Sequence, residues 1–180
     1  MAALWTRARV VARRMRTLIT LVLAASLSAC ATPATAERDA VCARLPVGDL
    51  CAYDKARDAD ADLSTAMEIA ADNGQMVLLV MGADWCHDSR ALAGHLAKPR
   101  FDALIAEHYR LVFVDVGRKN RNQHIARRFG LDGTPGTPTV LVLDSAGQPL
   151  NLDTAPSWRN AASRTEDAIF EYFDGFTKGE

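Results

Sequence analysis

The segment from Gly82 to Arg90 holds the residues best suited to chemistry. It follows a continuous apolar run and precedes a helical pattern, so we expect Cys86 at the N-terminus of a helix. Free backbone N–H groups and the positive end of the helix dipole stabilise an anion there, which lowers a thiol pKa and favours the nucleophilic thiolate. Ser89 follows three residues later and is placed to donate a hydrogen bond to that thiolate. The alternative is a buried structural cysteine followed by a helix-capping Asp88.

The pattern of apolar residues around this segment predicts alternating helices and strands. Apolar residues spaced i, i+3, i+4, i+7 from Leu63 predict a helix that ends at Asn73–Gly74. Later helices are expected at 86–97, where Pro99 ends or interrupts the helix, and at 101–105, 125–129 and 169–176. Continuous apolar runs predict buried strands at 77–81, 111–114 and 139–143, with a turn at 145–147 leading to a fourth strand near Leu150. This order is typical of an α/β sheet covered by helices on both faces.

Two motifs within this order of elements resemble the thioredoxin superfamily. One is Trp85-Cys86-x-x-Ser89 after the first strand, and the other is Gly133-Thr134-Pro135-Gly136-Thr137-Pro138-Thr139 before the third. The resemblance covers about residues 61–178 and implies a thioredoxin-like fold, a central mixed sheet with helices on both faces. It further implies a cis Thr137–Pro138 bond close to Cys86, with Trp85, Thr137 and Pro138 orienting the substrate and Cys86 and Ser89 at the catalytic positions. The segment looks most similar to the thioredoxin-like domains of periplasmic thiol-reducing systems.

The sequence departs from that family at two positions. Ser89 replaces the second active-site cysteine, and Val80 replaces the buried acid that usually stands six residues before the first. Without a resolving cysteine, a mixed disulfide at Cys86 needs glutathione, another protein, Cys42 or Cys51. We therefore expect isomerase-like or glutathione-linked exchange with protein thiols and disulfides rather than ordinary disulfide reduction. The alternative is a redox-inactive binding or scaffold module of the cell envelope, so the sequence leaves open whether the chain is an enzyme.

The N-terminal 29 residues have the pattern of a secretory signal. Five arginines and no acid precede an apolar run of twelve residues, which would span about 18 Å as a helix and is too short for a bilayer core of about 30 Å. Leu27-Ser28-Ala29-Cys30 resembles the bacterial lipoprotein box, which implies lipidation of Cys30. Ala31, which is not aspartate, then favours the outer membrane facing the periplasm. Cleavage after 34–36 to a soluble periplasmic protein is the alternative, and Met15 is an alternative start.

The remaining residues carry 16 basic and 22 acidic side chains. Such an acidic segment predicts no affinity for nucleic acid. We assign residues 30–60 to a tether and N-terminal extension and expect a local disulfide between Cys42 and Cys51 in the oxidising periplasm. One basic cluster is either a solvated face or a docking site for an acidic partner; it contains Arg118, Lys119, Arg121, Arg127 and Arg128.

No cofactor or metal is expected. Cys86, His87, Asp88 and His95 combine soft and hard ligands without the spacing of a closed zinc site.

Overall fold

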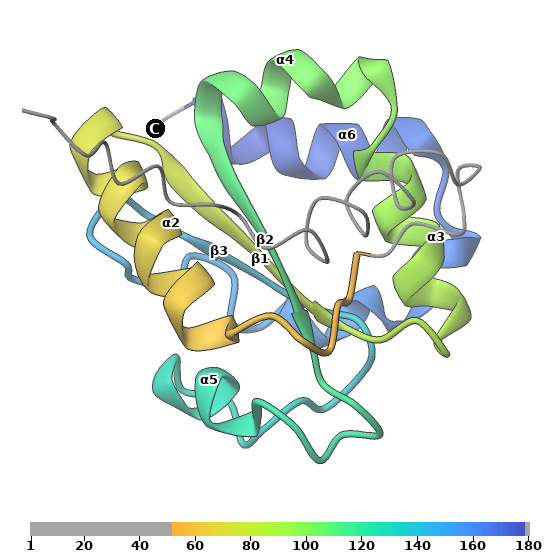
Figure 1. Ribbon diagram of the computed structural model, residues 1–180. Helices are drawn as coiled ribbons and strands as arrows, with labels where there is room; N and C mark the ends of the chain where they lie inside the picture. The colour runs from red at the N-terminus through yellow and green to blue at the C-terminus, as the bar shows by residue number, and fades with distance from the viewer. Residues whose placement is uncertain (1–51, 179–180) are drawn as a thin grey trace, which may run out of the picture.

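The computed structural model describes residues 52–178, which form a three-stranded sheet flanked by helices (Figure 1). The predicted leader, Cys30, the Cys42–Cys51 pair and the alternative start at Met15 lie outside the described residues. In chain order the elements are α2 (Ala59–Asn73), β1 (Met76–Gly82), α3 (His87–Leu96), α4 (Pro99–His108), β2 (Tyr109–Asp115), α5 (Gln123–Arg128), β3 (Thr139–Leu143), the 3-10 helix η1 (Ala155–Ser163), α6 (Glu166–Gly175) and the 3-10 helix η2 (Phe176–Lys178).

The sheet is mixed, as predicted. Its order is β2-β1-β3, with β1 parallel to β2 and antiparallel to β3. Val80 in the centre of β1 lies opposite Phe113 of β2 and Val140 of β3. The predicted apolar runs therefore form adjacent strands, and β1 is the central one.

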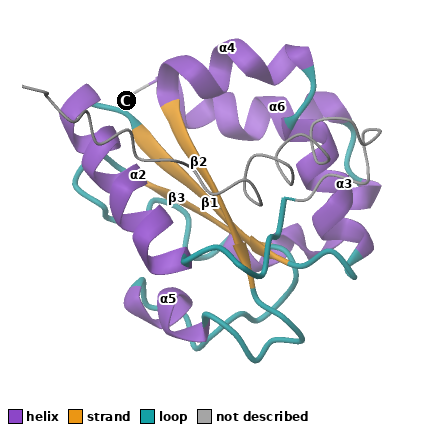
Figure 2. Cartoon of the chain, viewed as in Figure 1, coloured by secondary structure: helices purple, strands orange, loops and turns teal. Residues whose placement is uncertain are grey.

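Helices cover both faces of the sheet, and each face has its own apolar core (Figure 2). Alternate residues of each strand point to opposite faces, so Leu79 packs with Leu63 and Ile125 below α2 and α5. Val80, on the opposite face, packs in the cluster that contains Trp158 and residues of α3, α4 and α6. The expected thioredoxin-like α/β architecture is thus confirmed.

Local signals set the helix ends. Asp58 Oδ1 accepts hydrogen bonds from the N–H groups of Asp60 and Ala61 at the start of α2, and Gly74 ends this helix with φ +66°, as predicted. Pro99 lies in the first turn of α4, where it needs no hydrogen-bond donor, and so separates α4 from α3. Among residues 52–178, no helix is long and apolar enough to span a membrane.

The prediction of a fourth strand near Leu150 is wrong for this part of the chain. After the turn, pairing with β3 is limited to the Leu143–Pro149 bridge and one hydrogen bond from Leu150 N to Val142 O at 2.8 Å. Pro149 has no N–H to extend a ladder. Instead, the side chain of Asn151 hydrogen-bonds the backbone of β3 in place of a fourth strand. Its Nδ2 donates to Val140 O at 3.0 Å, and its Oδ1 accepts from Val142 N at 2.8 Å.

Candidate active site

Cys86 lies in the connection between β1 and α3. The strand ends at Gly82, a short turn follows, and Cys86 is the N-cap residue of α3 with extended backbone angles of −89° and 122°. The turn is closed by a hydrogen bond from Cys86 N to Ala83 O at 3.0 Å. The side chain is only 7 % exposed. The predicted position of the thiol at a helix N-terminus is therefore confirmed.

The loop of residues 133–138, called here the cis-proline loop, brings a second segment against the thiol. Its Thr137–Pro138 peptide bond is cis, as predicted. The Cys86 thiol donates a hydrogen bond to the carbonyl oxygen of Thr137 at 3.1 Å. Thr139 Oγ1 donates to Gly136 O at 2.8 Å and ties the loop to the start of β3. The thiol and the backbone of the cis-proline loop are thus in direct, largely buried contact.

Ser89 lies one turn into α3 and is fully buried. Its hydroxyl has no hydrogen-bond partner within residues 52–178. Burial raises the pKa of Cys86, but the hydroxyls of Ser89 and Thr137 and the N–H groups of Ser89 and Asp88 lower it by more, so the net shift of the pKa is downward. The arrangement favours a thiolate that accepts the Ser89 hydroxyl.

Tyr53 closes the site from behind, and the sequence did not mark it. It is 1 % exposed, although it falls in the predicted extension of residues 30–60, and its hydroxyl donates to Ser89 O at 3.1 Å. Gly82 leaves the room for this ring: a Cβ there would lie 2.6 Å from Tyr53 Cε1 and 2.7 Å from Ser89 Oγ. Burial raises the pKa of Tyr53 far above its ordinary value. Val80, at the position of the family's buried acid, is also buried and is apolar, so it offers no proton acceptor there.

Trp85 stands beside the thiol at the surface. Its side chain is 51 % exposed, and Nε1 donates to Gly117 O at 2.7 Å in the loop after β2. This bond joins the cysteine turn to the β2–α5 loop. An exposed aromatic face next to the nucleophile is available for contact with another molecule.

The neighbours of Cys86 on α3 have other roles. His87 is exposed. Asp88 does not cap α3, as the structural interpretation of Cys86 assumed; its Oδ1 accepts a hydrogen bond from Ala162 N at 2.9 Å and ties α3 to the end of η1. Within residues 52–178, no three His, Cys, Asp or Glu side chains lie together as a metal site would require.

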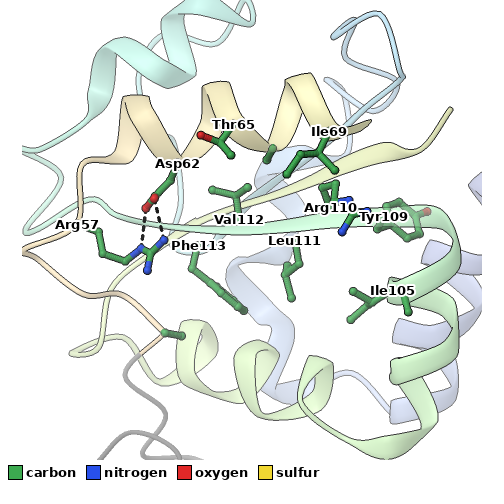
Figure 3. A pocket seen from close by; sticks show the side chains of 13 residues that line it. Arg57, Asp62, Thr65, Ile69, Ile105, Tyr109, Arg110, Leu111, Val112 and Phe113 are labelled. Atoms are coloured by element: carbon green, nitrogen blue, oxygen red, sulfur yellow. Dashed lines mark hydrogen bonds and ion pairs between the residues drawn. The ribbon is translucent and has the colours of Figure 1, made fainter. Parts of the chain in front are cut away.

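A cavity of about 550 Å³ opens between α2, α4 and β2 (Figure 3). Its apolar wall includes Ile69, Ile105 and Leu111, and Arg57 crosses its mouth to pair with Asp62 at 2.6 Å. None of the residues around Cys86 lines it. The thiol site is therefore separate from this cavity.

Comparisons with known proteins agree with this geometry. Residues 58–145 match the family described as Thioredoxin-like. A disulphide isomerase from Xylella fastidiosa Temecula1 is 32 % identical with a TM-score of 0.64, over 69 % of this chain and 95 % of that chain.

Two further solved structures resemble the chain more weakly. The C-terminal domain of Neisseria meningitidis DsbD in the reduced form is 25 % identical with a TM-score of 0.46, over 64 % of this chain and 95 % of that one. A thioredoxin from Thermus thermophilus is 19 % identical with a TM-score of 0.47, over 63 % and 82 %. No curated protein matches the chain significantly in sequence.

Proposed function

Because the chain belongs to the thioredoxin-like family, we propose that it is an exported monothiol protein that carries out thiol–disulfide exchange through Cys86. The observation that carries this proposal is the contact of Cys86 Sγ with Thr137 O, at 3.1 Å, beside the cis proline and at the N-terminus of α3. The likeness to a protein described as a disulphide isomerase supports the same chemistry.

The exchange begins with the thiolate of Cys86. It attacks one sulfur of a substrate disulfide, a Cys86–substrate disulfide forms, and the other substrate sulfur leaves as a thiolate. The site supports each part: the helix N-terminus and the Ser89 hydroxyl stabilise the attacking thiolate, and Thr137 and Trp85 offer backbone and an aromatic face to the substrate chain. Trp85 and Thr137–Pro138 thus act as orienting residues.

The second half of the exchange needs another thiol. Ser89 occupies the resolving position and has no sulfur. A thiol of the substrate itself then attacks the mixed disulfide, which completes an isomerisation, or glutathione attacks it and regenerates Cys86. The proposed partners are therefore protein thiols and disulfides, with glutathione as a small-molecule partner, and no nucleic acid.

We place the protein at the periplasmic side of the cell envelope. The lipoprotein-type signal and Cys30 support attachment to the outer membrane through a lipid, and the site at residues 34–36 supports a soluble form instead. Metabolic labelling with a radioactive fatty acid distinguishes these forms, since only the lipidated form retains label, and Cys30→Ala removes it.

The test of the proposal is reactivation of a disulfide-scrambled protein in a glutathione buffer. The wild-type chain should accelerate reactivation, and Cys86→Ser should lose the acceleration. His87→Ala, which changes an exposed neighbour, is the matched control and should retain it. Unchanged activity in Cys86→Ser would overturn the proposal.

The replacement of both the second cysteine and the buried acid, by Ser89 and Val80, favours one competing function: a binding module of the cell envelope without redox activity. That function predicts a partner captured equally well by the wild type and by Cys86→Ala.

A further inference from the structure

Three cationic side chains from three different elements contact the cis-proline loop. Lys119, in the β2–α5 loop, donates from Nζ to Pro135 O at 3.2 Å. Arg127 of α5 reaches the start of the loop, where a Cβ on Gly133 would lie 3.9 Å from its Nη2. Arg159 of η1 packs on Gly136, where a Cβ would lie 3.1 Å from the Arg159 Cβ. We call Lys119, Arg127 and Arg159 the cationic rim.

The cationic rim forms no ion pair with a carboxylate of the described residues. All three side chains are exposed, and within residues 52–178 none has an acidic group at ion-pair distance. Five other cations in the described part of the chain each have a carboxylate within 4.0 Å: Arg57, Lys98, Arg100, Arg121 and Lys178. Unpaired cations on one edge of an acidic segment create a local positive potential.

The basic cluster predicted from the sequence is thus divided by the fold. Arg121 is neutralised by Asp115 at 3.2 Å. Arg128 turns away from the loop and places Nη2 3.8 Å from Met67 Sδ. Arg118 is exposed and has no carboxylate at ion-pair distance among residues 52–178. Lys119 and Arg127 lie at the loop, and Arg159 joins them from a distant part of the sequence. Lys119, Arg127 and Arg159 therefore lie along the cis-proline loop that carries Thr137, the contact of the thiol.

We propose that the cationic rim selects polypeptide disulfides flanked by carboxylates, so that the preferred substrate carries Asp or Glu beside the disulfide cysteine. This rests on the proposed function of Cys86. The exchange step is unchanged: the Cys86 thiolate bonds to one substrate sulfur, the S–S bond breaks, and the other sulfur leaves with the electron pair. The rim attracts the acidic substrate before this step and holds it in the mixed disulfide after it. Asp84 is the carboxylate of the cysteine turn, and burial raises its pKa while Lys55 and Arg90 act in the opposite direction.

The test compares three peptide disulfides that differ only in charge. Each is a disulfide-linked dimer of acetyl-X-Cys-X-amide with X as Glu, Gln or Lys, and mass spectrometry follows the mixed disulfide on Cys86 of the full chain. At low ionic strength we expect the Glu dimer to react about tenfold faster than the Lys dimer, with the Gln dimer between them. High salt should bring the three rates together because it screens exposed charges. Ratios between dimers are used because the thiolate fraction of Cys86 cancels in them.

Charge-reversing substitutions test which side chains cause the preference for the Glu dimer. Lys119→Glu and Arg159→Glu should each lower the Glu-to-Lys rate ratio severalfold. Arg128→Glu is the matched control: it makes the same change of charge on the neighbour of Arg127, whose side chain faces Met67. It should leave the Glu-to-Lys rate ratio within about twofold of the wild-type value.

The outcomes separate the two proposals. If Cys86 reacts with none of the three dimers, the proposed function and the inference fail together. If it reacts with all three at the same rate, or if Arg128→Glu lowers the ratio as much as Lys119→Glu, exchange stands and the cationic rim has no role in selection.

Discussion

Replacing Ser89 with alanine should separate reactivity from stability. The Ser89 hydroxyl lowers the pKa of Cys86, and a hydrogen bond to a charged group contributes about 1.5–3 kcal/mol. Since about 1.4 kcal/mol corresponds to a factor of ten, Ser89→Ala should lower the rate of alkylation at neutral pH about tenfold. The pKa of Cys86 should rise correspondingly.

The same substitution should cost little stability when Cys86 is protonated. The buried Ser89 hydroxyl has no hydrogen-bond partner among the described residues, and an unsatisfied buried hydroxyl costs about 1–3 kcal/mol. Its removal offsets the small cavity that alanine leaves. We therefore expect the free energy of unfolding at acidic pH to stay within about 1 kcal/mol of the wild type.

The pH dependence of stability follows from the lowered pKa. Because the folded protein binds the Cys86 proton less tightly than the unfolded chain does, stability rises with pH from the folded-state pKa up to the ordinary thiol value of about 8.5. This contribution is lost as pH falls through the folded-state pKa. Ser89→Ala should make the rise smaller.

The rate of alkylation and the pKa of Cys86 are measured by iodoacetamide alkylation against pH, with the label located at Cys86 by mass spectrometry. The free energy of unfolding and its pH dependence are measured by denaturant unfolding of the reduced protein. Ser145→Ala, an exposed serine in the turn after β3, is the matched control. An alkylation profile of Ser89→Ala identical to that of the wild type would refute the role given to the hydroxyl.

Three further changes test the packing around the site. Gly82→Ala should lower the free energy of unfolding by about 1–3 kcal/mol because the new Cβ would lie 2.6 Å from the Tyr53 ring. The control Gly175→Ala, whose Cβ would have no atom within 4 Å, should change the free energy of unfolding by less than about 0.5 kcal/mol. Equal effects of the two substitutions would contradict the contact with Tyr53. Asn151→Ala should cost about 1–3 kcal/mol in a denaturant titration, because two backbone groups of β3 lose their partner. Tyr53→Phe should cost about 1 kcal/mol through loss of the bond to Ser89 O, and thermal unfolding at the wild-type temperature would show that this bond contributes nothing.

The parts of the fold that the sequence predicts are those with a local signal. The continuous apolar run at 77–81 indicates a strand because a strand buried on both faces is apolar at every position and the run is short for a buried helix. The order of strand, cysteine turn and helix likewise predicts Cys86 at the start of α3, and the motif around Pro138 predicts the cis bond. Each signal lies within about ten residues of the feature it predicts.

The parts that the sequence did not reveal depend on contacts between distant segments. Tyr53 lies in a stretch without periodicity, and its burial depends on contacts with distant residues: the space above Gly82, the bond to Ser89 O and the ring of Phe113. Asn151 replaces a strand because Pro149 cannot continue the ladder, which a turn pattern alone does not show. Arg159 reaches the cis-proline loop from η1, so its part in the cationic rim requires the fold.

The two apolar cores on opposite faces of the sheet hold different parts of the site. The nucleophile belongs to α3, which is anchored through Leu92 in one core, whereas α5 and the loop before it are anchored through Ile125 in the other. Substitutions in separate cores have nearly additive effects on stability. Residues 116–128, the loop after β2 and α5, can therefore be exchanged to change partner choice, by selection or by an engineer, while the core that holds α3 and the reactive thiol is left intact.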